Sequence, residues 1–122
     1  MEMKGFVFDF GWKKSIDFQF EENMRIECVF SAFEGERLSP EQEAAFAEFE
    51  KNKARYEKTS VEIFAKYAQK ERLAHASAAP TALFFKRDGS FGLLLECSWE
   101  PEHGAVIVLY PEQWVGTQDM FL

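Results

Sequence analysis

The chain has 122 residues, of which 47% are hydrophobic and 29% charged, and its formal net charge is −7. This length suits a single domain, residues 1–122, and the 14 phenylalanines argue for a packed interior and against disorder. The acidic charge disfavours non-specific binding to nucleic acid or to an anionic membrane, and it suits a basic protein partner.

In three stretches of the first third of the chain, every second residue is apolar, so that the apolar side chains would lie on one side of an extended chain. These stretches are 5–12, 16–20 and 24–30. A period of two with many aromatic residues is typical of strands, so we expect three of them. The first strand should end at Gly11 and the lysine pair 13–14.

The second and third predicted strands are joined by residues 21–23, which predict a hairpin with a three-residue loop. Asn23 would take the left-handed conformation that such a loop requires. The register then sets Phe20 opposite Met24. One face carries the apolar side chains of both strands: Ile16, Phe18, Phe20, Met24, Ile26 and Cys28.

A single long helix is predicted from Ser39 to about Ala74. Ser39 is a suitable N-cap, Pro40 suits the first helical position, and Gln42 can close a capping box with the cap residue.

An apolar stripe supports this helix and recurs at three- and four-residue steps. The stripe is weakened at Asn52 and again at residues 59–60, so a kink at either place is compatible with the pattern. Pro80 should stop any helix that reaches it. The stripe comprises Phe46, Phe49, Tyr56, Ile63, Phe64 and Tyr67.

Two three-residue loops that end in glycine, 87–89 and 102–104, predict two further hairpins in the last third of the chain. Gly89 and Gly104 should both have positive φ angles, which glycine adopts without steric cost. The first loop sets Phe85 opposite Phe91.

The second loop sets Trp99 opposite Ile107.

On the far face of this predicted meander the side chains are not uniformly polar, although a face open to water should be. Either the chain ends cover this face or it meets a partner, and we expect the tail with Trp114, Met120 and Phe121 to dock. The candidate partner surface consists of Phe84, Leu94, Val106, Val108 and Tyr110.

These elements predict an α+β fold. Its antiparallel sheet has about six strands, in the order βββ-α-βββ, and one long helix packs across one face. The two cysteines, Cys28 and Cys97, fall in apolar strand patterns and are expected to be reduced core residues. With no secretory pattern at the N-terminus, we expect a cytoplasmic protein.

The strongest candidate for chemistry is a polar group made of Glu96, Glu100 and His103. It could form an acid–base or metal site, but one imidazole and two flexible carboxylates fall short of the usual four ligands. An exposed turn histidine is the simpler interpretation. The sequence therefore predicts no catalytic, cofactor-binding or metal-binding residues.

Residues 88–94 (DGSFGLL), 96–104 (ECSWEPEHG) and 116–119 (GTQD), with the helix start at 39–42, resemble a family of small bacterial domains of uncharacterised function. Those domains in turn resemble the immunity proteins encoded beside bacterial toxins. The resemblance implies no catalytic residues, because the family has none assigned.

The leading hypothesis is therefore a non-enzymatic protein-binding module, in particular an immunity-type inhibitor of a bacterial toxin with a basic partner. One alternative is a small-ligand binder or enzyme with a cavity between helix and sheet. Another is a structural domain that associates with itself, as a homodimer, through the apolar strand face.

Overall fold

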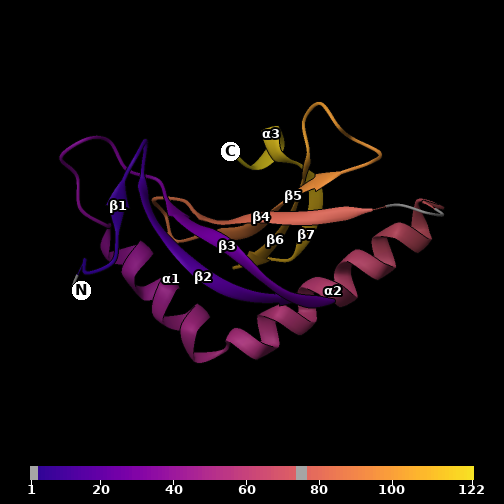
Figure 1. Cartoon of the computed structure of the whole chain (residues 1–122), viewed down its shortest axis with the longest axis horizontal. Coiled ribbons are helices and arrows are strands. Elements are labelled where there is room, and N and C mark those ends of the chain that lie inside the picture. Colours follow the sequence, from indigo (N-terminus) through magenta and orange to yellow (C-terminus); the bar gives the residue numbers. More distant parts are fainter. Residues whose placement is uncertain (1–2, 74–76) are drawn as a thin grey trace.

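The structure is a computed structural model that describes residues 3–73 and 77–122. In this part of the chain the fold is α+β, with one seven-stranded sheet whose strands lie in sequence order. Helices α1 and α2 cover one face of the sheet, and α3 lies on the other (Figure 1). The elements are β1 (Val7–Phe8), β2 (Trp12–Phe20), β3 (Glu22–Phe30), α1 (Pro40–Lys51), α2 (Lys53–Lys70), β4 (Ala78–Phe85), β5 (Phe91–Cys97), β6 (Ala105–Tyr110), β7 (Trp114–Thr117) and α3 (Gln118–Phe121).

All neighbouring strands are antiparallel except β3 and β4, which pair in parallel. Since α1 and α2 form the crossover between β3 and β4, the chain returns to the sheet in the same direction. The predicted α+β class is confirmed. The predicted number of strands is wrong, because the C-terminal tail adds β7 to the sheet.

The N-terminal strands differ from the prediction in their bounds. β2 already begins at Trp12 and includes both lysines of the 13–14 pair, whereas β1 has only two residues. The chain turns between them because Phe10 and Gly11 have φ angles of 56° and 132°. The predicted alternation across 5–12 therefore stops at Phe8.

The β2–β3 hairpin is tighter than expected. Phe20 lies opposite Glu22 and Phe18 opposite Met24, and the residue with positive φ is Glu21 (63°). The predicted loop and the predicted left-handed Asn23 are therefore wrong. The register error is two residues, an even number, so the same side chains still face the core.

The predicted start of the helix is confirmed. The Ser39 hydroxyl accepts from the Gln42 N–H, and the Gln42 side chain accepts from the Ser39 N–H, each at 3.0 Å. The predicted single helix is interrupted at Asn52, with φ −118°, one of the two places where a kink was expected.

The end of the helix was misplaced. Ala74 lies outside the described residues, and α2 ends at Lys70, followed by Arg72 in the left-handed region (φ 55°). Pro80 does not act as the stop, because it lies within β4, next to a register shift.

The two C-terminal hairpins had different outcomes. The β4–β5 register is confirmed, with Phe85 opposite Phe91, and Gly89 has the expected positive φ (92°). The β5–β6 register is wrong, because Ile107 pairs with Leu93. Trp99 leaves the sheet and stacks on Phe64 of α2, with ring centroids 5.8 Å apart.

The core lies between the sheet and the two long helices. Phe30 stacks on Phe85 at 4.6 Å, and Phe18 lies parallel to Phe49 at 6.4 Å. Both cysteines are buried and free, as predicted. Within the described residues, no helix is both long and apolar enough to span a membrane.

Candidate functional site

The predicted polar group is only partly assembled. His103 Nδ1 lies 3.0 Å from Glu100 Oε1, at the exposed loop between β5 and β6. This hydrogen bond raises the pKa of His103, and nearby Asp119 adds to the effect. The imidazole and both carboxylates face water, so the arrangement is a surface ion pair and not a desolvated acid–base site.

Glu96 does not join this pair. It lines an open hollow of about 570 Å³ together with Cys97, Ser98 and Ser77, and neither Glu100 nor His103 is part of that lining. Burial raises the pKa of the Cys97 thiol, so the sulfur there is a poor nucleophile. Among the described residues, no group of three or more His, Cys, Asp or Glu side chains could hold a metal ion.

The predicted partner surface is mostly covered by the protein itself. Val106 and Val108 are buried beneath Phe121, with Phe84, Leu94 and Trp114 packed around them. The tail therefore docks on this face, as one of the two alternatives predicted. Of the five candidate residues only Tyr110 is exposed.

Exposed acidic and apolar residues occur together in the last part of the chain, with Lys86 and Arg87 next to them. We call these exposed residues the C-terminal surface and define it as Tyr110, Glu112, Asp119, Met120 and Leu122. Its three apolar members are 37%, 68% and 59% exposed. Glu112 and Met120 line a small hollow of about 190 Å³ together with Lys86, and Leu122 lines another with Lys86 and Arg87.

The charge of this end of the chain is one-sided. From Asp88 to Leu122 there are six carboxylate side chains and no lysine or arginine. A hydrogen bond from the Thr117 side chain lowers the pKa of Asp119, which favours its charged form. The absence of lysine and arginine after Arg87 is a sequence signal that could have identified this surface.

The sequence analysis did not identify two exposed aromatic residues near the N-terminal end of the sheet. Phe10 is 97% exposed and Phe33 is 81% exposed, on the β1–β2 turn and the β3–α1 loop. The indole Nε1 of Trp12 donates to the Glu36 carbonyl at 2.7 Å and ties these two loops together. We call Phe10 and Phe33 the aromatic tips.

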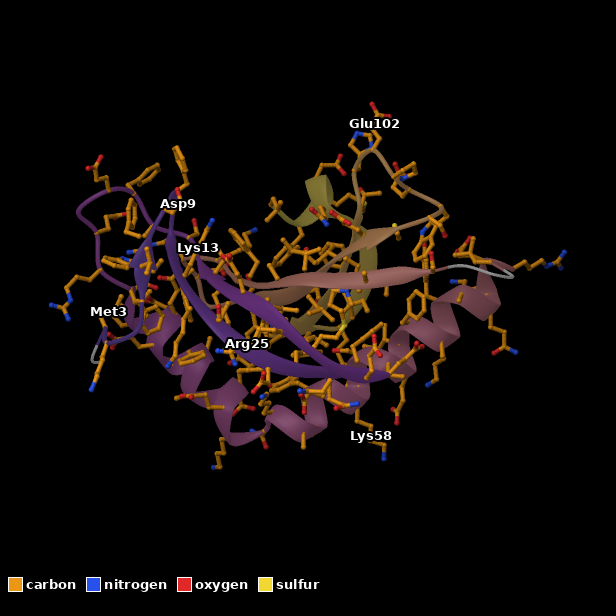
Figure 2. The ribbon with its side chains drawn as sticks, in the orientation of Figure 1. Met3, Asp9, Lys13, Arg25, Lys58 and Glu102 are labelled. Carbon is orange, nitrogen blue, oxygen red and sulfur yellow. The ribbon has the colours of Figure 1, made fainter. Side chains whose placement is uncertain are left out.

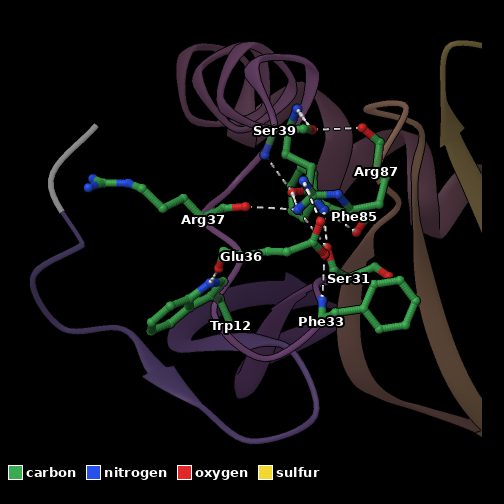
Figure 3. Close-up of polar contacts among 9 residues, drawn as sticks. Trp12, Ser31, Phe33, Glu36, Arg37, Ser39, Phe85 and Arg87 are labelled. Atoms are coloured by element: carbon green, nitrogen blue, oxygen red, sulfur yellow. Dashed lines mark hydrogen bonds and ion pairs between the residues drawn. The ribbon is translucent and has the colours of Figure 1, made fainter.

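The β3–α1 loop is held by a polar network around Arg87 (Figure 3). Arg87 Nη1 donates to the carbonyls of Ser31 and Arg37 at 3.2 and 2.9 Å, and Glu36 Oε1 accepts from the Phe33 N–H at 2.7 Å. The network fixes the loop backbone while leaving the Phe33 ring in solvent.

The charged groups are unevenly distributed over the molecule. Glu102 stands at the tip of the β5–β6 loop, whereas Lys58 projects from α2 on the opposite side (Figure 2). The water-facing residues of α2 include three lysines and one arginine, whereas the stretch from Asp88 to Leu122 has neither residue type.

Comparison of the chain with models of protein families, with curated proteins and with solved structures found no match. Function has therefore to be inferred from the surfaces just described.

Proposed function

We propose that the protein is a non-enzymatic protein-binding module whose C-terminal surface receives a basic protein partner. The observation that carries this proposal is that Tyr110, Met120 and Leu122 are exposed on a stretch of chain, from Asp88 to Leu122, that has six carboxylate side chains and no lysine or arginine. Protein interfaces commonly combine an apolar centre with a charged rim. Negative potential at the rim would speed encounter with a basic partner.

Two features support binding over catalysis. In the described residues, Glu96 is separated from the Glu100–His103 pair, and that pair is exposed. Catalytic groups usually converge in a pocket that shifts their pKa values by desolvation. The most strongly buried titratable side chain here is the thiol of Cys28, which burial keeps protonated.

Within this class, we favour an immunity-type inhibitor of a bacterial toxin. The support is the resemblance of residues 88–94, 96–104 and 116–119 to small bacterial domains that themselves resemble immunity proteins. An adjacent toxin gene, and protection of cells that co-express this protein with the toxin, would support the role. Co-expression without protection would contradict it.

The binding proposal can be tested with two variants and one control. Met120→Ser removes an exposed apolar side chain, and Glu112→Lys reverses a charge on the same surface. Lys58→Glu reverses a charge on α2, where Lys58 makes only an exposed ion pair with Glu62 at 3.9 Å. All three substitutions are at the surface and should change stability by less than about 0.5 kcal/mol.

The wild-type chain and the three variants would each be immobilised and used to recover proteins at low and high salt. We expect a basic partner whose affinity, measured with the purified proteins, falls at least tenfold with Met120→Ser and with Glu112→Lys, and by less than twofold with Lys58→Glu. An acidic partner, or one lost only with Lys58→Glu, would overturn the proposal.

A further inference from the structure

The last strand of the sheet, β7, has β6 on one side and no strand on the other. Gln118, the residue after β7, donates its N–H to the Gly104 carbonyl at 3.3 Å, toward the β6 side. Backbone groups alternate in direction along a strand. Val115 and Thr117, an odd number of residues before Gln118, therefore turn their N–H and C=O groups away from β6.

The two edges of the sheet are protected differently. On the first edge, β1 pairs with Trp12 and Lys13, and the Glu57 carboxylate of α2 accepts from the Gln19 N–H. The Thr117 carbonyl is the N-cap acceptor for the first turn of α3. No described side chain bonds the other outward backbone groups of β7, which are the N–H groups of Val115 and Thr117 and the Val115 carbonyl. The strand also lacks the charged residues, proline or bulge that usually prevent an edge from pairing.

Charge distinguishes between the segments that could pair with this edge. Glu112 precedes β7 and Asp119 follows it, both exposed. A second copy that paired antiparallel to β7 would bring Glu112 toward Asp119 of the other copy, and like charges across a strand pair are destabilising. A basic segment would place its lysines or arginines beside the same two carboxylates.

A hollow beside β7 can receive a side chain of such a segment. It has a volume of about 190 Å³ and is lined by Trp114 of β7, by apolar side chains that include Met120 and Phe121, and by the charged side chains of Glu112 and Lys86. Long basic side chains bury their methylene stems on apolar surface while the charged end stays near water. Lys86 already does so, with its Nζ 5.1 Å from the centre of the Phe121 ring, so the remaining apolar walls fit an apolar side chain of the segment that alternates toward this face.

We infer that β7 is a docking edge, and that an extended basic segment of the partner adds to it as a further strand of the sheet. This inference rests on the proposed function, because it states how the basic partner is engaged. Main-chain hydrogen bonds to the N–H groups of Val115 and Thr117 and to the Val115 carbonyl supply affinity. The hollow beside Trp114 receives an apolar side chain of the segment, and the flanking carboxylates of Glu112 and Asp119 supply selectivity for its basic residues.

Thr117→Pro tests the edge directly. The φ angle of Thr117 is −85°, close to the value that proline imposes, and its N–H points away from β6, so the β6–β7 ladder stays intact. Thr117→Val is the matched control, because it also loses the hydroxyl that bonds Asp119 but keeps the N–H. Circular dichroism and urea unfolding of both variants check that the fold is retained.

The probe is a synthetic ten-residue peptide of alternating valine and threonine with two arginines at each end. A second peptide has glutamates in place of the arginines, and a third is the basic peptide with N-methylated alternate amides. Each would be titrated into the full ¹⁵N-labelled chain. We expect the basic peptide to shift the amides of Val115 and Thr117, and Thr117→Pro to weaken its binding at least tenfold relative to Thr117→Val.

The possible outcomes separate this inference from the proposed function. Equal binding by Thr117→Pro and Thr117→Val, or by the N-methylated peptide, overturns the docking edge. If Glu112→Lys still weakens that binding, the basic-partner proposal stands. Equal binding of the glutamate peptide overturns both. If the protein is a dimer in solution and Thr117→Pro abolishes the dimer mass, the occupant of the edge is a second copy and the proposal of a basic segment is overturned. Absence of binding of the basic peptide at millimolar concentration also overturns that proposal.

Discussion

Replacement of Gln42 by leucine should destabilise the protein by about 2–3 kcal/mol. The Gln42 side chain is fully buried at the first turn of α1. Its Nε2 donates to the carbonyls of Ser31 and Phe85, at 2.8 and 3.2 Å, and its Oε1 accepts from the Ser39 N–H at 3.0 Å and from Arg87 Nη1 at 3.1 Å. One side chain thus joins β3, β4, α1 and the β4–β5 turn.

The size of this loss of stability follows from the hydrogen bonds that each partner of Gln42 loses. The Ser31 carbonyl keeps Arg87, and the Phe85 carbonyl keeps the Ser31 N–H, so these acceptors lose one bond each, worth about 0.5–1 kcal/mol. The Ser39 N–H loses its only partner while buried, which costs about 1–3 kcal/mol. Burial of the added apolar surface of leucine offsets roughly 1 kcal/mol.

The assay is urea unfolding followed by far-ultraviolet circular dichroism, with the slope of the transition fitted separately for each variant. Glu41→Gln is the control, because Glu41 is exposed in the same helical turn. A double-mutant cycle with Arg87→Met should show that Gln42→Leu costs at least about 0.5 kcal/mol less once Arg87 is absent. A loss below about 1 kcal/mol, or strict additivity with Arg87→Met, would refute this account of the network.

Three further predictions concern single side chains. Phe10→Asn should stabilise the protein by about 1 kcal/mol, because an exposed ring is replaced at φ 56° by a residue that tolerates the left-handed region; a lower urea midpoint would contradict this. Because burial raises the pKa of the Cys28 thiol, iodoacetamide should label Cys28 only after unfolding, as followed by mass spectrometry; rapid labelling of the native chain would show that the site opens. The Glu100 hydrogen bond raises the pKa of His103 above its ordinary 6.5, so its stabilising effect is complete below pH 6.5 and is lost as pH rises through the folded-state pKa. The urea midpoints of wild type and His103→Gln should therefore differ at low pH and converge at high pH, and a gap that widens with pH would reverse the assignment.

Much of the local structure could be predicted because it depends on neighbours in sequence. The capping box at Ser39 needs only the right residue three positions later, and the β4–β5 register needs only a glycine in the loop 87–89. The side of the sheet that faces the core also follows from alternation alone. That is why an error of two residues in the β2–β3 register left Phe18 and Ile26 correctly placed.

The candidate site was predicted less well, because it depends on which surfaces meet. The sequence identified Val106 and Val108 as an apolar far face and Phe121 as part of a docking tail, but not how completely the tail would cover them. The aromatic tips were not identified, because Phe10 falls within the predicted strand 5–12 and Phe33 in the loop before the predicted helix, and nothing in the pattern shows that the chain turns at Phe10.

By itself the sequence determined the class of fold, the start of α1, the core-facing side of each strand and the acidic character of the last third of the chain. Each of these is set by short-range sterics, by hydrogen bonds within one turn, or by composition. Only the tertiary structure decided that β3 and β4 pair in parallel, that Trp99 leaves the sheet for α2, and that β7 is left as an edge. Those outcomes depend on how elements distant in sequence compete to bury the same apolar surface, and local patterns carry no information about that competition.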